Sequence, residues 1–457
     1  MSATAVPARS GAGRRADRAA PSAEGNGARA AARGLAATLA LVAVAIAVPA
    51  AAGWDVHVRG YAPLLAEWAP RAGAATAAAV ALAFLAARFA VDLTERLPWR
   101  ALLAAVFACG LAWMLALALV DGTQGLGHVL ETPYEYLRTA RRVSGLHELL
   151  QEYVSRIPYA SAPKPNWPVH VAGHPPGALL FFVGLDRLGL GGGLAAGLVV
   201  TVLAATTAMA VLITLRVLGE ETMARRAAPF LVFGPAAVWQ AVSADAMFAA
   251  VAAWGLAALA LAATRRSAAW AVVGGLLLGW CAMLSYGLLL LAIPALTVIA
   301  RGGWWRAIPF TAAAALAVLL AFAALGFSYL EALPVLRERY LDGVGGRRPA
   351  SYWLWGGFAA LAISAGPLAG AGLAQLPSHA RDASARAAAA LAAAGAASVL
   401  VAASTQMSKA EVERIWLPFV PWILLGCALL PEHWRRRGLV LQLAVALAVQ
   451  HLLRIDW

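Results

Sequence analysis

The residues best suited to chemistry are acids that stand at the ends of long apolar runs. Asp121 is followed by Gly122 where one run ends, and Asp245 stands between two other runs. A carboxylate at such a boundary costs free energy unless it is solvated or paired, and its partial removal from water suits a general base. The structural alternatives are an Asp-Gly turn that ends a helix at Asp121 and a helix N-cap at Asp245.

A more specific motif is His174-Pro175-Pro176-Gly177. Its two prolines stiffen the chain and stop a preceding helix, so the imidazole of His174 is expected to be held in one place. The alternative is a loop that starts the next helix, with proline in its first turn. The histidines show no spacing typical of a metal site, so we expect no structural metal.

Two groups of cations suit phosphate binding. In the segment 408–416, Lys409 and Arg414 could clamp a phosphate, while Glu411 and Glu413 orient them or bind sugar hydroxyls. A second cationic loop includes Arg339. The alternative for both groups is an interfacial loop whose cations extend into water.

The elements that must position these residues are membrane helices. Of the 457 residues, 62% are hydrophobic and only 13% are charged, which excludes an ordinary soluble enzyme. The apolar runs predict an all-α polytopic membrane protein with about thirteen spans. These spans are 35–53, 73–92, 101–120, 193–215, 227–242, 246–263, 269–283, 286–300, 307–325, 353–375, 387–404, 416–430 and 438–454.

The charges predict how these spans are oriented. Residues 1–34 are rich in arginine, alanine and glycine, and we expect them to form a disordered cytoplasmic tail. With this tail inside, more than half of the 36 basic residues fall in inner segments, as the positive-inside rule requires. Topology therefore explains the net charge of +13, and we expect no nucleic-acid partner. Most of the 23 acids fall outside, so the outer face of the plasma membrane is the expected working face.

The longest outer segment is 121–192, which contains Tyr134 and Glu135. Apolar residues recur with helical spacing over 144–157, which predicts an amphipathic helix on the membrane surface. The apolar segment 178–190 is too short to span, so a re-entrant or interfacial helix is expected there.

Taken together, these motifs resemble the GT-C superfamily of integral-membrane glycosyltransferases, of the protein mannosyltransferase and aminoarabinose-transferase type. Asp121 matches the acid that starts the family's first outer loop, the motif at 174–177 matches its closing HPPL-like motif, and Asp245 matches the acid of the second outer loop. The resemblance covers about 101–265. The chain departs from the family in having Asp121-Gly122 instead of Asp-Glu or Asp-x-Asp, and Gly177 instead of leucine. The chain as a whole also looks like uncharacterised actinobacterial membrane proteins.

The resemblance implies a polyprenyl-phosphate sugar donor (a hexose such as mannose, or a pentose) and a lipid, glycan or protein acceptor. On this view Asp121, Asp245 and His174 are catalytic, and Tyr134, Glu135, Pro175 and Pro176 belong to the substrate loop. Whether a divalent cation takes part is left open. The implied organisation is a tail (1–34), two extra spans (35–100), a catalytic module (101–265) and C-terminal spans with donor-binding outer loops (266–457).

Two other classes remain as alternatives. A multi-pass transporter or lipid flippase would need ionisable residues near the middle of its spans and, commonly, inverted repeats. A scaffold protein would not need its acids gathered on one face. An outer cavity that brings Asp121, Asp245, His174 and residues 409–414 together would favour a transferase, whereas a central pathway open to both sides would favour transport.

Overall fold

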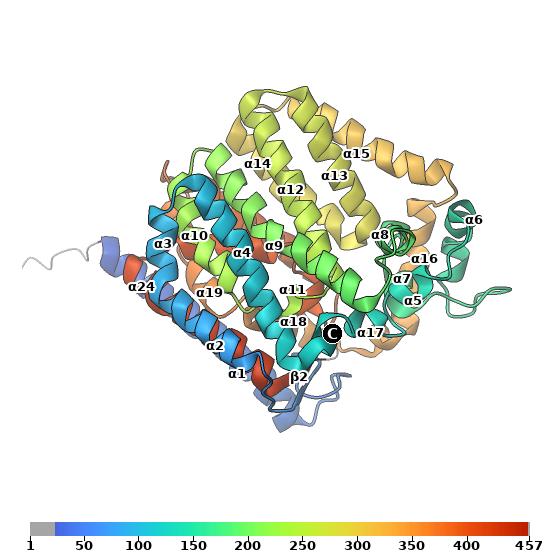
Figure 1. Ribbon diagram of the computed structural model, residues 1–457, viewed down its shortest axis with the longest axis horizontal. Coiled ribbons are helices and arrows are strands. Elements are labelled where there is room, and N and C mark those ends of the chain that lie inside the picture. Colours follow the sequence, from blue (N-terminus) through green and yellow to red (C-terminus); the bar gives the residue numbers. More distant parts are fainter. Residues whose placement is uncertain (1–22, 456–457) are drawn as a thin grey trace, which may run out of the picture.

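The computed structural model describes residues 23–455, with side chains from residue 25 onward. The described chain is almost wholly α-helical, with one short two-stranded sheet (Figure 1). The all-α class expected from the sequence is confirmed.

The first helix begins earlier than expected. Helix α1 spans Ala23–Ala52, so residues 23–34, which were expected to be disordered, are helical. Alanine is the strongest helix former, and Gln375 donates a hydrogen bond of 3.0 Å to the carbonyl of Gly27. Residues 1–22 of the predicted tail lie outside the described residues.

A short strand and two long helical rods follow α1. Their elements are β1 (Ala66–Trp68), α2 (Thr76–Leu85), the π-helical turn η1 (Ala86–Ala90), α3 (Val91–Arg96) and α4 (Trp99–Ala118). The first rod runs without a break from α2 through the π-helical turn to α3.

Between α4 and α9 the chain forms short helices and turns. They are η2 (Leu119–Leu126), η3 (Val129–Glu131), α5 (Leu137–Ala140), α6 (Leu146–Gln151), η4 (Val154–Arg156), α7 (Val169–Gly173) and α8 (Pro176–Arg187). At 1.5 Å per residue, α8 is too short to cross a bilayer, as expected.

The predicted amphipathic surface helix over 144–157 is wrong in extent and in what its apolar face contacts. Only α6 and a 3-10 turn form there. Tyr153 and Ile157 are fully buried in protein. The Tyr153 hydroxyl donates to the carbonyls of Val171, at 2.8 Å, and His174, at 3.0 Å. The apolar face that was expected to contact the membrane therefore packs against other parts of the protein.

The centre of the molecule is a group of closely packed helices. They are α9 (Gly193–Val217), α10 (Glu221–Phe233), α11 (Ala237–Gln240), α12 (Ala244–Arg265), α13 (Ala268–Leu284), the 3-10 turn η5 (Tyr286–Leu291), α14 (Ala292–Gly302) and α15 (Ala307–Ala324). A Cβ atom at Gly275 of α13 would lie 2.4 Å from the carbonyl of Thr311 in α15. Small residues let these backbones approach, which is how helices associate in lipid.

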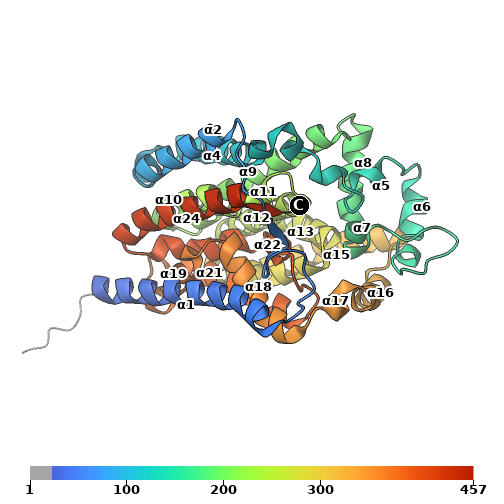
Figure 2. The same ribbon diagram turned by 90° about the horizontal axis from the view of Figure 1, so that it is seen from below.

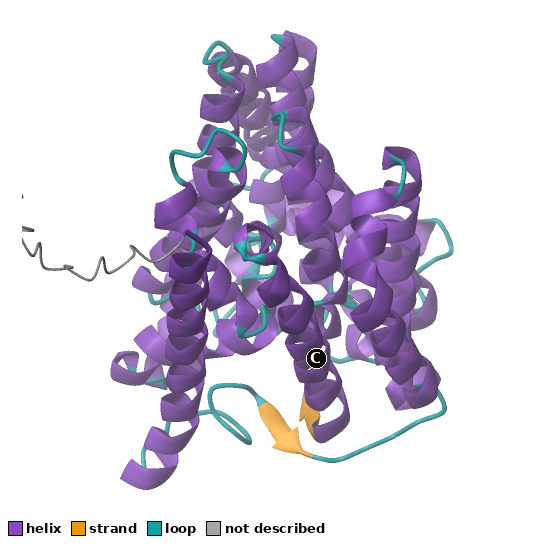
Figure 3. Ribbon diagram, turned by 90° about the vertical axis from the view of Figure 1, so that its left-hand side faces the viewer, coloured by secondary structure: helices purple, strands orange, loops and turns teal. Residues whose placement is uncertain are grey.

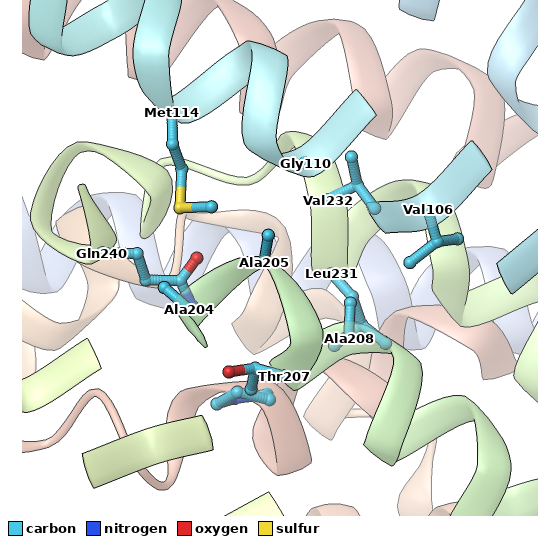
Figure 4. A pocket seen from close by; sticks show the side chains of 11 residues that line it. Val106, Gly110, Met114, Ala204, Ala205, Thr207, Ala208, Leu231, Val232 and Gln240 are labelled. Carbon is cyan, nitrogen blue, oxygen red and sulfur yellow. The ribbon is translucent and has the colours of Figure 1, made fainter. Parts of the chain in front are cut away.

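One small void remains in this core, between α4, α9, α10 and α11 (Figure 4). Its volume of about 20 Å³ is enough for a single water molecule. The Thr207 hydroxyl lines it and has no hydrogen-bond partner among the described residues. This void is too small to be a substrate site.

The C-terminal half returns to α1 and β1. Its elements are α16 (Tyr329–Asp342), α17 (Val344–Arg347), α18 (Ala350–Ser364), α19 (Leu368–Leu373), α20 (Leu376–His379), α21 (Arg386–Ser404), α22 (Val412–Ile415), α23 (Val420–Ile423), the 3-10 turn η6 (Leu424–Leu429), α24 (Glu432–Leu452) and β2 (Leu453–Ile455). Strand β2 pairs antiparallel with β1 (Figure 3). Helix α1 lies along one edge of the molecule, against α18 and α19 (Figure 2).

Seven of the described helical segments are long and apolar enough to cross a membrane. They are Gly25–Ala52, Thr76–Arg96, Trp99–Glu131, Gly193–Val217, Ala244–Arg265, Ala307–Ala324 and Arg386–Ser404. Shorter apolar helices cover Ala268–Leu284, Tyr286–Gly302 and Val420–Leu429. The protein is therefore a polytopic helical membrane protein. The other predicted spans coincide with helices that are interrupted or carry charges, so the number thirteen stays a prediction.

Loops between helices that the sequence assigned to the cytoplasmic side of the membrane contact one another at one end of the helix bundle. Arg225 donates to the carbonyl of Leu97 at 2.8 Å, and Glu220 accepts from the N–H groups of Ala387 and Ala388. We call this the basic end. It comprises residues 93–100, 216–226, 376–386 and 431–437.

Loops that the sequence assigned to the outer side of the membrane meet at the other end of the helix bundle, which we call the cavity end. Arg348 donates to the carbonyl of Lys409 at 2.6 Å, and Trp353 donates to the carbonyl of Val56 at 3.1 Å. This end comprises residues 54–72, 121–192, 326–352 and 405–415, together with β2.

Candidate functional site

A cavity of about 1030 Å³ lies at the cavity end, and we call it the polar cavity. The cavity is lined by the loop around β1, the end of α4 with η2, η3 and the residues after it, and the start of α7. The rest of the lining comes from α11 and the turn after it, α17 and its C-cap, the N-cap of α22, the end of α24, and β2. Most of the residues that line it belong to segments that the sequence assigned to the outer side, whereas others, such as Ala118, Val238 and Gln450, fall within predicted spans. The cavity is large enough for a drug-sized ligand.

The lining of the polar cavity carries more positive than negative charge. Its arginines are Arg59, Arg71, Arg348 and Arg454, and its acids are Asp121 and Glu411. Within the described part of the chain, the guanidinium groups of Arg59 and Arg454 have no hydrogen-bond or ion-pair partner. Such a lining suits an anionic ligand, because unpaired guanidinium groups bind phosphate and carboxylate in a bidentate manner.

Asp121 lies in this lining, in a turn directly after α4. The following Gly122 has a φ of +70°, a conformation that glycine adopts without strain. Arg71 donates to both carboxylate oxygens, and Gln450 donates to one of them at 2.9 Å. The side chain stays 38% exposed, so the carboxylate is held in orientation and still open to the cavity.

Beside the polar cavity, whose lining includes His170 and Glu411, Arg414 of α22 joins groups that lie far apart in the sequence. Its guanidinium lies 3.1 Å from Glu135, 3.3 Å from Asp245 and 3.7 Å from Glu411. It also lies 3.1 Å from Nε2 of His170, whose Nδ1 is 2.8 Å from Glu135. We call these five residues the Arg414 cluster.

Most side chains of the Arg414 cluster are buried. Arg414, Glu135 and Asp245 are each at most 5% exposed. Burial alone would lower the pKa of Arg414, but the surrounding carboxylates, Asp245 first, outweigh it and raise that pKa. Burial raises the pKa of Glu135, but the charges of His170 and Arg414 reverse this and hold it below its ordinary value. Arg414 and Glu135 therefore stabilise each other as ions.

Asp245 is not the N-cap of α12, the alternative role that the sequence suggested for it. Ser243 is the N-cap of α12, and its hydroxyl accepts from the N–H of Asp245 at 3.1 Å. The carboxylate of Asp245 is thereby free to pair with Arg414.

The His174-Pro175-Pro176-Gly177 motif starts α8, with Pro176 in its first turn. Nδ1 of His174 lies 2.9 Å from the Tyr136 hydroxyl and 2.8 Å from the carbonyl of His170. Burial lowers the pKa of His174, which favours a neutral imidazole. His174 thus positions the residues beside the Arg414 cluster and does not line the polar cavity.

Gly177 stands where the HPPL-like motif that the sequence resembles has leucine, and its small size has a physical reason in this chain. A Cβ atom there would lie 2.6 Å from the carbonyl oxygen of Met283 at the end of α13. The departure from the family motif therefore permits close contact between α8 and α13. Pro175 and Pro176 are buried beside this contact.

Two residues that were predicted to bind the phosphate of the sugar donor, Lys409 and Arg339, lie outside the polar cavity. Lys409 donates to the carbonyls of Gly345 and Arg348, and Arg339 donates to those of Ile157 and Trp167. Neither side chain lines the polar cavity. These cations satisfy main-chain carbonyls, so the structure does not bring them to a phosphate-binding position.

Two of the predicted acids on α22 and its N-cap differ in surroundings. Glu411 lines the polar cavity and lies 3.6 Å from Arg348. Glu413 is fully buried, and among the described residues no other residue forms a hydrogen bond with its carboxyl oxygens. Burial raises the pKa of Glu413 to about 7.

Backbone strain gathers around the polar cavity. His57, Val242 and Glu411 all line it and have φ between 53° and 60°, a region that residues with a side chain rarely adopt. Such conformations persist only where surrounding contacts impose them, and they are common at functional sites.

The sequence analysis missed several lining residues, including Arg59, Arg71, Gln450 and Arg454. A signal was present, because Arg59 and Arg71 stand in a short outer loop where the positive-inside rule disfavours arginine. Tyr134, which was predicted, is 54% exposed and does line the cavity.

The acids of the site are paired with arginines, and in the described part of the chain none of them belongs to a group of three metal-ligating side chains. Among residues 25–455, no three His, Cys, Asp or Glu side chains are grouped so as to hold a metal ion. Asp121, Asp245 and Glu135 are each paired with a guanidinium, which a cation would have to displace.

No family model matches the chain, and no curated protein is significantly similar to it.

Proposed function

We propose that the protein is a membrane glycosyltransferase of the GT-C type that moves a sugar from a polyprenyl-phosphate donor to a hydroxyl acceptor. One observation carries the proposal: the polar cavity combines an open, oriented carboxylate with a surplus of arginines. The carboxylate suits activation of a hydroxyl, and the arginines suit a phosphate that leaves.

In the proposed reaction, Asp121 takes the proton of the acceptor hydroxyl. The acceptor oxygen forms a bond to the anomeric carbon while the bond from that carbon to the phosphate oxygen breaks, through an oxocarbenium-like transition state. Polyprenyl phosphate leaves with the bonding electron pair.

The developing phosphate charge would be met by arginines of the lining. Arg59 and Arg454 are unpaired among the described residues, and Arg348 is fixed by the carbonyl of Lys409. The Arg414 cluster would support this wall from behind, because it links α12 and α22 to the loop that holds Glu135.

The proposal includes the orientation expected from the sequence. The thirteen spans would place the N-terminus in the cytoplasm and the polar cavity outside the plasma membrane. The acceptor would be a lipid, a glycan or a protein, and membrane lipids would surround the spans.

The arrangement of the lining favours transfer over transport. A transporter or flippase must connect both sides of the membrane, whereas none of the residues that line the polar cavity belongs to the basic end. The gathering of acids and arginines in one cavity also exceeds what a scaffold needs.

The test is transfer by purified protein in lipid nanodiscs from labelled polyprenyl-phosphate sugars. We expect Asp121→Asn to lower the transfer rate by about a hundredfold or more, the usual effect of losing a general base. The matched control is Asp342→Asn, an exposed acid of the same end that does not line the cavity. Transfer by Asp121→Asn at the wild-type rate would show that Asp121 is not the base, and no transfer from any such donor would exclude the function.

A further inference from the structure

A second cavity, lined almost entirely by apolar side chains, lies beside the polar cavity. Its volume is about 540 Å³, and we call it the apolar cavity. Its lining includes Ile46 of α1, Ile363 of α18, and Trp68 and Leu453 of the two strands. None of the residues that line it is charged.

We infer that the apolar cavity binds the isoprenoid chain of a lipid-linked substrate whose phosphate occupies the polar cavity. The inference rests on the proposed function and adds where the lipid is held.

The two cavities share a thin wall, the sheet formed by β1 and β2. Successive residues of a strand face opposite sides. Leu453 lines the apolar cavity, whereas Arg454 and Ile455, the next two residues of β2, line the polar cavity. In β1, Ala66 and Trp68 share the side of the apolar cavity, and Ala69, directly after the strand, lines the polar one. An amphiphilic ligand could therefore place its anionic head in the polar cavity and its apolar chain in the apolar cavity, on opposite sides of this wall.

The apolar cavity also opens where a lipid would arrive. Ile46 lies in a helix that is long and apolar enough to cross a membrane, and its side chain is 47% exposed. Tyr61 and Trp68, which also line the apolar cavity, are 60% and 59% exposed. Aromatic residues of this kind are favoured at the membrane interface. A lipid could thus enter sideways from the bilayer with its phosphate next to the arginines.

The residues that line this cavity lie outside the segment that resembles the glycosyltransferase module. They come from α1, from the loop around β1, from α18 and from β2. The elements before residue 101 and the end of the chain thereby gain a function that the resemblance does not imply.

The first experiment compares donors with a long and a short polyprenyl chain. We expect the wild-type protein to have a KM about tenfold lower for the long-chain donor, the effect of burying about two methylene groups. The double variant Ile46→Trp/Ile363→Trp fills the cavity and should lose this preference without change for the short-chain donor. The control is Val44→Trp, because Val44 is 48% exposed on the same helix and does not line the cavity.

The second experiment needs no transfer reaction. A long-chain polyprenyl phosphate that carries a diazirine in its chain is photolysed with the protein in nanodiscs. We expect adducts within residues 46–68, their loss in the filled variant and their retention in Val44→Trp. Adducts that persist in the filled variant, or that phosphatidylglycerol displaces equally well, would overturn the inference.

The two experiments separate the inference from the proposed function. Cavity-dependent adducts without sugar transfer would leave the lipid site standing and reject the transferase. Sugar transfer without chain-length preference or cavity-dependent adducts would support the transferase function and reject the lipid site.

Discussion

At the scale of single residues, Arg414 is the group on which most charged contacts depend. It compensates two buried carboxylates, those of Glu135 and Asp245. Removal of one partner from a buried ion pair costs about 3–5 kcal/mol, because an uncompensated charge remains. We therefore expect Arg414→Met to lower the thermal unfolding temperature of the purified protein clearly.

The control for this prediction restores the charge balance. The triple variant Arg414→Met/Glu135→Gln/Asp245→Asn should regain much of the lost stability, because no buried charge is left without a partner. Arg187→Met, an exposed arginine on α8, should unfold like the wild type. Equal stability of Arg414→Met and the wild type would mean that the ion pairs do not form.

Glu413 leads to a prediction about pH. Its pKa is raised by burial from 4.5 to about 7, so the folded protein binds the proton more tightly than the unfolded chain. Stability is then greatest below pH 4.5 and falls as pH rises to 7, by about 3 kcal/mol. In Glu413→Gln this contribution disappears, so the variant should be more stable than the wild type at pH 8.

The measurement for Glu413 is the unfolding temperature between pH 5 and pH 8 for both proteins. The difference between wild type and variant isolates Glu413 from other titrating groups. Glu338→Gln, an exposed position, should leave the pH dependence unchanged. Parallel curves for wild type and Glu413→Gln would contradict the assigned burial effect.

At the scale of elements, the contact between α8 and α13 explains why this chain has glycine within its HPP motif. We expect Gly177→Ala to destabilise the protein by about 1–3 kcal/mol, because the new Cβ would meet the carbonyl of Met283 at 2.6 Å. The larger side chain of Gly177→Leu, which introduces the leucine of the HPPL-like motif, should destabilise the protein more.

Gly184 on the same helix is the matched control. A Cβ atom at Gly184 has no neighbour within 4 Å, so Gly184→Ala should be neutral or stabilising by up to about 1 kcal/mol. Thermal unfolding of both variants distinguishes steric conflict from the helix propensity of alanine. If Gly177→Ala were as stable as Gly184→Ala, α8 would have to be free to move away from α13.

The elements also show what sequence can and cannot predict. Long apolar runs predict helices well, because a chain in lipid must satisfy its backbone hydrogen bonds within each segment. The loop between α4 and α9 was harder, since its helices are short and fixed by distant groups. Arg339, for instance, binds the carbonyl of Trp167, 172 residues away. The motif residues were found individually, but the pairing of Arg414 with Glu135, across 279 residues, was not foreseeable from spacing.

At the scale of the whole molecule, the two ends of the bundle make the topology testable. Helix α1 starts near Gln375 at the basic end, and β2 closes the described chain at the cavity end, so the described chain crosses between the ends an odd number of times. Both the seven helices suited to crossing a membrane and the thirteen predicted spans satisfy this condition.

Cysteine labelling in intact cells decides which end faces outward. Tyr159→Cys lies at the cavity end and Arg381→Cys at the basic end, and both side chains are exposed. A membrane-impermeant maleimide should label residue 159 in intact cells and residue 381 only after the membrane is opened. The unmodified protein controls for the native cysteines, of which Cys281 and Cys427 are buried and Cys109 is half-buried. Labelling of residue 381 alone in intact cells would invert the orientation and place the polar cavity in the cytoplasm, where the positive-inside rule would be violated.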